Sequence, residues 1–93
     1  MKPSPKKNSK LMNFKFAAKP GSEVYVAGSF NNWDPKATPL KDMPQIGLYA
    51  TALRIPPGRH EYKFIVNGKW CTDPQCAESA PNSHGSLNSV VTV

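Results

Sequence analysis

The sequence predicts an all-β domain, an antiparallel β-sandwich of about seven short strands, and three observations lead to this fold class. Short apolar segments alternate with polar residues at a period of two, the pattern of half-buried strands. Turn-forming residues separate these segments at close intervals, and ten prolines are spread over the chain. No apolar pattern runs long enough for a helix. A chain of 93 residues forms a single domain with a modest hydrophobic core.

The start of the chain differs from the rest in charge. Residues 1–10 hold four of the twelve basic residues, so residues 11–93 hold eight basic against six acidic residues. We therefore expect residues 1–10 to be a disordered basic tail and residues 11–93 to be the folded domain.

The first two strands are predicted at residues 11–18 and 24–27. In the first strand, alternate residues are apolar and point to the same face of the sheet. Phe14 and Phe16 lie on this face and are assigned to the core. Gly28 ends the second strand, and we expect another backbone to approach it closely.

A turn and a loop follow the second strand. Residues 29–35 are dense in Asn, Asp and Pro, which form side-chain-to-backbone turns. A tryptophan held rigidly in such a turn, Trp33, loses little entropy when a ligand stacks on it. Residues 36–47 are predicted to be a loop in which Leu40 and Met43 contact the core.

The next two strands are predicted at residues 48–55 and 59–66. Pro56-Pro57-Gly58 lies between them, and we expect it to reverse the chain so that the two strands are antiparallel neighbours. Asn67-Gly68 then predicts a type I′ hairpin, because both residues tolerate positive φ. The return strand carries Trp70.

Alternation within residues 59–66 assigns side chains to two faces. Tyr62 and Phe64 belong to the inward face, and Glu61, Lys63 and Ile65 to the outward face. The outward lysine is therefore expected close to the tryptophan that follows the turn.

A long loop is predicted at residues 72–85 and a final strand at residues 87–93. Strands of this number and spacing are typical of a two-layer, immunoglobulin-like sandwich.

No secretory signal and no apolar run of bilayer length occur in the sequence, so we expect a cytoplasmic protein without a membrane partner. Cys71 and Cys76 are expected as reduced thiols, although their spacing also permits a disulfide. His60 and His84 are the only histidines, and no Cys-x-x-Cys motif is present. We therefore expect no metal and no cofactor.

Several motifs together resemble a known family. In chain order they are VYVAGSFNNW (24–33), PGRHEYKF (57–64), VNGKW (66–70), DP (73–74) and NSHGSLNSVVTV (82–93). They resemble the glycogen-binding domain of AMP-activated protein kinase β subunits and, more broadly, the family 48 carbohydrate-binding modules that precede the barrels of isoamylases and branching enzymes. The resemblance covers about residues 12–93. It implies an early-set, immunoglobulin-like β-sandwich that binds α-1,4-linked glucans such as glycogen, starch or maltodextrin.

The resemblance also implies which residues contact the sugar. Trp33 and Trp70 match the two stacking tryptophans, and Lys63 matches a lysine that hydrogen-bonds sugar hydroxyls. A glucose ring presents C–H groups on its face, and an indole buries them at small entropic cost. Two indoles set at an angle would favour a curved α-glucan over a flat, cellulose-like chain.

The closing loop, residues 84–88, is implied to add polar contacts. Asn88 matches a sugar-contacting asparagine, and Ser86 stands where kinase members have threonine. His84 stands where they have a leucine, a departure that should alter affinity or preferred chain length. Asn32 is a further candidate for hydrogen bonds to hydroxyls.

Each of these residues also has an ordinary structural interpretation. A lone tryptophan is commonly a core residue, and Lys63 by itself is a solvated strand lysine. Ser86 and Asn88 are equally suited to satisfying backbone groups at the start of a strand.

We therefore predict a non-catalytic α-glucan-binding module that assists a glycan-active enzyme or a kinase. Glycoside hydrolysis needs two facing carboxylates, whereas the acidic residues here are scattered. Nucleic-acid binding is not expected, because the body of the chain is nearly neutral and lacks an RNP-like motif. The alternative is a protein-interaction or enzyme-accessory early-set domain with a weak or lost sugar site.

Overall fold

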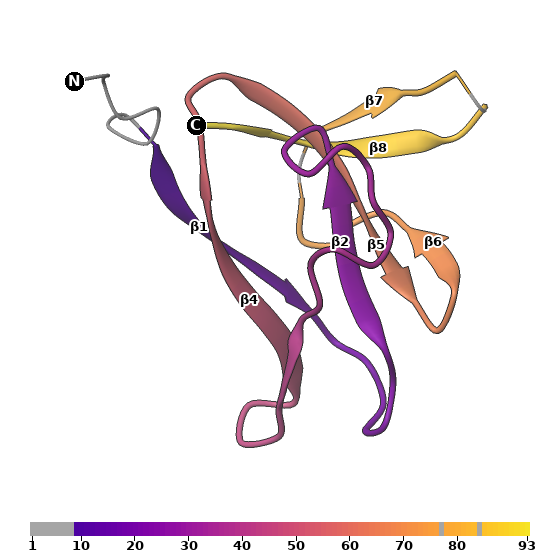
Figure 1. Ribbon diagram of the computed structural model, residues 1–93. Coiled ribbons are helices and arrows are strands. Elements are labelled where there is room, and N and C mark those ends of the chain that lie inside the picture. The colour runs from indigo at the N-terminus through magenta and orange to yellow at the C-terminus, as the bar shows by residue number, and fades with distance from the viewer. Residues whose placement is uncertain (1–8, 77, 84) are drawn as a thin grey trace.

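The computed structural model describes residues 9–76, 78–83 and 85–93, and it confirms the predicted all-β sandwich. Antiparallel strands form two sheets, seen as separate layers in Figure 1. The strands of the described chain are β1 (Lys10–Phe16), β2 (Val24–Gly28), β3 (Lys41–Met43), β4 (Leu48–Ile55), β5 (Arg59–Val66), β6 (Lys69–Cys71), β7 (Ser79–Pro81) and β8 (Leu87–Thr92). Of the predicted tail, residues 1–8 lie outside the described residues, and Lys10 already belongs to β1.

Strand β5 is the centre of the larger sheet. The smaller sheet has the order β1-β4-β3, and the larger has the order β2-β5-β8-β7, with β6 also paired to β5. One edge of β5 is shared end to end, because β8 pairs with residues 59–62 and β6 pairs with residues 64–66. Strand β2 pairs with the other edge. Strand β5, and with it the side chains on its outward face, is therefore fixed by three neighbouring strands.

The hydrophobic core lies between the two sheets. Its buried residues are Phe14, Val24, Val26, Leu40, Tyr49, Ile55, Tyr62 and Phe64. The predicted inward parity of Tyr62 and Phe64 is confirmed. Because successive side chains of a strand point to opposite faces, the same parity directs Glu61 and Lys63 away from the core.

The predicted pairing of the strands at 48–55 and 59–66 is wrong. Strand β4 pairs with β1 and β3, so both of its edges are occupied, and β5 belongs to the other sheet. Prolines 56 and 57 lack the N–H groups and the freedom of φ that a tight hairpin needs. The chain instead crosses between layers, and Gly58 exchanges backbone hydrogen bonds with Val93 at 3.0 and 2.9 Å.

Two predicted loops contain short strands, β3 and β7, that the sequence did not reveal. Residues 38–40 also run along the free edge of β2, where Leu40 N donates to the carbonyl of Val24 at 2.8 Å. Leu40 is buried as expected, but the prediction for Met43 is wrong. Its side chain is 38% exposed, because it lies on the edge strand β3, opposite Leu48.

Two further sequence observations concern the cysteines and the membrane. Cys71 and Cys76 are both free thiols. The described residues include no helix long and apolar enough to cross a membrane.

Gly28 lies at the end of β2, paired with Tyr62 of β5, and has no room for a side chain. A Cβ atom at this position would lie 2.5 Å from the carbonyl oxygen of Glu61 and 2.7 Å from the ring of Phe30. The expected close backbone approach is thus confirmed, and it ties the end of β2 to the strand that carries the outward-facing residues.

We predict that Gly28→Ala lowers the free energy of unfolding by about 2–3 kcal/mol, because the added methyl group overpacks a site bounded by backbone. Urea denaturation measures this loss. The matched control is Gly47→Ala, where a Cβ would meet no atom within 4 Å and φ is +69°. The free energy of unfolding of that variant should fall by only about 1 kcal/mol, the cost of placing alanine in the left-handed region. Equal losses for the two variants would contradict the close approach.

Candidate functional site

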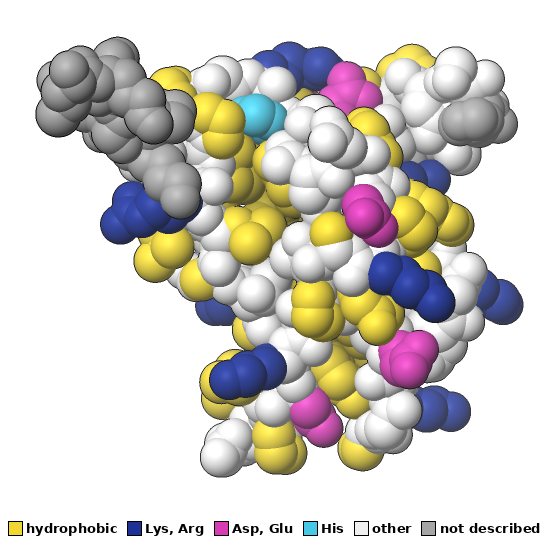
Figure 2. Space-filling view, in the orientation of Figure 1, with side chains coloured by type: hydrophobic (Ala, Val, Ile, Leu, Met, Phe, Trp, Pro, Cys, Tyr) yellow, Lys and Arg dark blue, Asp and Glu magenta, His cyan; other side chains and the backbone are white. Residues whose placement is uncertain are grey.

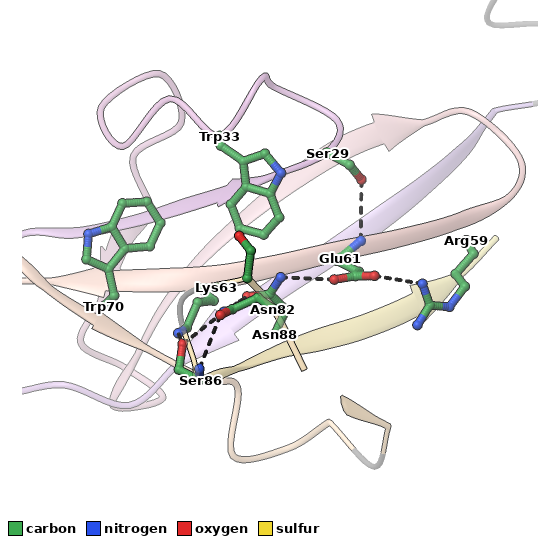
Figure 3. Close-up of a pocket in the computed structure, with 10 residues that line it drawn as sticks. Ser29, Trp33, Arg59, Glu61, Lys63, Trp70, Asn82, Ser86 and Asn88 are labelled. Carbon is green, nitrogen blue, oxygen red and sulfur yellow. Dashed lines mark hydrogen bonds and ion pairs between the residues drawn. The ribbon is translucent and has the colours of Figure 1, made fainter. Parts of the chain in front are cut away.

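A groove of about 860 Å³ opens on the outer face of the β2–β5–β8 sheet. Its lining residues, nine of them labelled in Figure 3, are Ser29, Trp33, Arg59, Glu61, Lys63, Trp70, Asn82, Ser83, Ser86 and Asn88. Five residues predicted from the sequence are brought together here: Trp33, Lys63, Trp70, Ser86 and Asn88. Asn32 is exposed but does not line the groove. His84 lies outside the described residues.

Asn31 holds the loop that carries Trp33. Its Oδ1 accepts a hydrogen bond from Gly28 N at 3.0 Å, and its Nδ2 donates to Val26 O and to Thr38 Oγ1, both at 3.0 Å. Trp33 N donates to Gly28 O at 2.9 Å. One side chain therefore joins the loop to β2 and to the segment along its edge. The predicted turn with side-chain-to-backbone hydrogen bonds is confirmed, although the residue responsible, Asn31, was not singled out from the sequence.

The backbone of this loop is strained at the tryptophan itself. Asn32 and Trp33 have φ values of 59° and 57°, in the left-handed region. Asparagine tolerates this region, but for a bulky residue it costs about 1–2 kcal/mol. Strain of this kind persists where surrounding contacts hold the backbone, and it concentrates at functional sites. It directs the Trp33 indole over the groove (Figure 3).

Trp70 reaches the same groove from the hairpin between β5 and β6. Asn67 and Gly68 have φ values of 51° and 85°, as the predicted type I′ turn requires. Ile65 lies directly opposite Trp70 on one side and Tyr25 on the other, all on one face. Ile65 is 5% exposed while Trp70 is 46% exposed. The indole therefore covers an apolar side chain with part of its surface and leaves the rest open to solvent.

The segment after β6 is anchored to the sheet by a buried tyrosine. Tyr62 Oη donates to Asp73 Oδ2 at 2.6 Å, and Asp73 N donates to Ser89 Oγ at 2.8 Å. Burial, followed by the hydrogen bond to the Asp73 carboxylate, raises the pKa of Tyr62. The phenol therefore stays protonated and keeps the strand of Trp70 close to β5 and β8.

A continuous set of hydrogen bonds forms the polar side of the groove (Figure 3). Lys63 Nζ donates to Ser86 Oγ at 3.0 Å. Asn82 Nδ2 donates to both Ser86 Oγ and Asn88 Oδ1 at 2.9 Å. Asn88 Nδ2 donates to Glu61 Oε1 at 2.9 Å. These contacts join β5, β8 and the turn between β7 and β8, and they orient each polar group before any ligand arrives.

Glu61 ends this set of hydrogen bonds in an ion pair. Its Oε2 lies 2.7 Å from Arg59 Nη1, and the two side chains are 28% and 51% exposed. The hydrogen bond from Asn88, and then the contact with Arg59, lower the pKa of the Glu61 carboxyl. Five residues that line the groove were not predicted as site residues from the sequence: Arg59, Glu61, Ser29, Asn82 and Ser83. Outward parity with Lys63 was the available signal for the first two.

The groove therefore combines two indoles with directed donors and acceptors, and it carries little net charge. Arg59 and Lys63 add two positive charges to the one negative charge of Glu61. On the face seen in Figure 2, basic and acidic side chains are interspersed. No group of three or more His, Cys, Asp or Glu suited to a metal occurs among the described residues. This arrangement suits a neutral ligand that has an apolar face and a hydroxyl-bearing rim.

Comparisons with known proteins agree on one family. Residues 12–93 match the family described as "Glycogen recognition site of AMP-activated protein kinase". The chain is 38% identical over 74 residues to 5'-AMP-activated protein kinase subunit beta-2 of Mus musculus, covering 78% of this chain and 26% of that protein. The Homo sapiens beta-2 subunit is also 38% identical, with 78% and 25% covered. The Sus scrofa beta-1 subunit is 39% identical, with 78% and 56% covered. The chain thus spans about a quarter of the mouse and human subunits.

We predict that Trp33→Gly is more stable than Trp33→Ala by about 1 kcal/mol, because glycine removes the left-handed backbone cost while both variants lose the same indole. The difference is measured by urea denaturation. Trp70 provides the control, since it lies in a strand, where glycine is less favourable than alanine. The same order at both positions would contradict the strained backbone at Trp33.

We predict that Glu61→Gln lowers the free energy of unfolding at about pH 7 and that the difference from the wild type shrinks on acidification. Because the folded-state pKa is lowered, the contribution of the carboxylate is complete above the unfolded pKa of about 4.3 and is lost as the pH falls through the folded pKa. Urea denaturation from about pH 7 to about pH 3 tests this. A difference that grows with acidity would be the contrary result.

Proposed function

The chain belongs to the family of glycogen recognition sites of AMP-activated protein kinase, and on this premise we propose that it is a non-catalytic module that binds α-1,4-linked glucans such as glycogen. Starch and maltodextrin present the same repeating unit. The relatives are kinase subunits, so we also propose that the chain serves a kinase or a glycan-active enzyme as its glucan-binding part, in the cytoplasm. None of these assignments requires a cofactor.

One observation carries the proposal: Trp33 and Trp70 line a single groove on one face of the sheet. Their indoles come from different elements, the loop after β2 and the strand β6. Each is positioned by its own backbone, so neither needs to rearrange on binding. Stacking a glucose ring on each would contribute about 1.5–3 kcal/mol of gross burial.

The polar side of the groove supplies partners for the hydroxyl rim of the sugar. Lys63 can donate, because its ammonium has three N–H groups and directs one to Ser86. Ser86 Oγ accepts from Lys63 and Asn82, so it keeps its O–H to donate. Asn88 retains one N–H and one lone pair beyond its contacts with Asn82 and Glu61. Asn88 is only 6% exposed. We therefore assign direct sugar contact to Lys63 and Ser86 first, and to Asn88 at its accessible edge.

Binding by one such module should be weak. Ordering and orientational costs offset much of the gross stacking energy. We expect a dissociation constant on the order of micromolar to millimolar, strengthened when several modules meet one polymer.

Catalysis is not part of the proposal. Glu61 is the one carboxylate among the described residues that line the groove, whereas glycoside hydrolysis uses a facing pair. The alternative function, a protein-interaction or accessory domain with a weak or lost sugar site, makes the opposite prediction in a binding experiment.

We predict that maltoheptaose or β-cyclodextrin perturbs the tryptophan fluorescence and the amide NMR shifts of groove residues. Trp33→Ala and Trp70→Ala should each weaken binding by about tenfold or more, because each removes one stacking platform.

The matched control is Ile46→Ala, which truncates an apolar side chain that is 59% exposed outside the groove. This variant should bind as the wild type does. Wild-type spectra that do not change at millimolar sugar would remove the proposed function and favour the interaction domain.

A further inference from the structure

The groove is longer than the part that the two indoles cover. Arg59, Glu61 and Lys63 follow one another on the outward face of β5, and Trp70 lies opposite Ile65, the next outward residue. At about 3.3 Å per residue, Arg59 and Ile65 are roughly 20 Å apart along the strand. Figure 3 shows the same order, with Trp70 at one end, Trp33 between, and Arg59 at the other end.

The far end of the groove offers unsatisfied hydrogen-bonding capacity of both kinds. A carboxylate has about four lone-pair positions, and Glu61 uses two side-chain contacts, with Asn88 at 2.9 Å and Arg59 at 2.7 Å. Arg59 has five N–H donors and directs one to Glu61. The carboxylate acceptors of Glu61 and the guanidinium donors of Arg59 thus lie side by side, and both side chains are partly exposed.

We infer that the Arg59–Glu61 pair is a third sugar-binding position, which takes the vicinal 2- and 3-hydroxyls of a glucose unit beyond the two indoles. This inference rests on the proposed function. The carboxylate accepts from one or both hydroxyls and the guanidinium donates to their oxygens. In an α-1,4-linked chain these two hydroxyls are not used in the linkage, so every unit offers them.

Glu61 is held in place before binding, and Arg59 is paired to it. They are two residues apart on β5 and share one face. Asn88 on β8 restrains the carboxylate from one side. Ser29 restrains the backbone of Glu61: its Oγ accepts from Glu61 N at 3.3 Å, and its N–H donates to Glu61 O at 3.0 Å. The low pKa of Glu61 keeps it an acceptor at neutral pH. Little ordering cost therefore opposes the added contacts of the carboxylate.

The test compares sugar lengths at neutral pH, with affinities measured by NMR shift titration. Maltose has no glucose unit left once both indoles are occupied, whereas maltoheptaose has several. Glu61→Gln should weaken maltoheptaose binding by about tenfold, because charge-assisted hydrogen bonds are lost. Maltose binding should change less than about twofold. Arg59→Gln, which leaves the Glu61–Asn88 contact available, should act in the same direction.

The controls separate this role from simple positioning of Asn88. If Glu61 only oriented Asn88, both sugars would lose affinity by the same factor in Glu61→Gln, and that result overturns the third position. Unchanged maltoheptaose affinity in Glu61→Gln overturns it as well, with the proposed function intact. A wild type that binds neither sugar overturns both. Asp42→Asn, which removes a charge on the other sheet, should bind both sugars as the wild type does.

Discussion

The pairing of β5 on both of its edges is the constraint on which the rest of the structure depends. Its inward residues, Tyr62 and Phe64, are part of the core, and its outward residues, Glu61 and Lys63, form the floor of the groove. Strand alternation links the two sets, because a slip of one residue would exchange the faces. Hydrophobic burial therefore fixes the register of the groove, and the close approach at Gly28 leaves no room for a side chain beside the Glu61 carbonyl.

Local patterns in the sequence were enough to predict this part of the molecule. Period-two alternation assigned both faces of residues 59–66, and Asn67-Gly68 specified the hairpin that carries Trp70. The density of Asn, Asp and Pro around Trp33 predicted a rigid turn. All of these signals lie within about ten residues of the side chains that they position, so no knowledge of the tertiary arrangement is required.

The features that were missed depend on partners far away in the chain. The pairing of β4 with β1, and not with β5, decides which layer each strand joins, and Pro56-Pro57-Gly58 is compatible with a local reversal or a crossing. Asn88 and Glu61 are 27 positions apart and meet only because β8 lies beside β5. The alternation of residues 59–66 placed Glu61 on the correct face of the sheet. Which side chains lie beside it on that face depends on the order of the strands, and short sequence patterns do not encode this order. The roles of Asn32 and His84 in sugar binding stay predictions.

The shielding of Ile65 by Trp70 bears on how such chains are compared. A substitution of Trp70 uncovers the nearly buried isoleucine, so folding alone gives a reason to retain an aromatic side chain there. Trp33 has the reverse character, since its backbone conformation works against stability. When related chains are compared, a tryptophan kept at position 70 is therefore explained by folding alone. A tryptophan kept at position 33 is the better sign that the chain is under selection to bind a ligand.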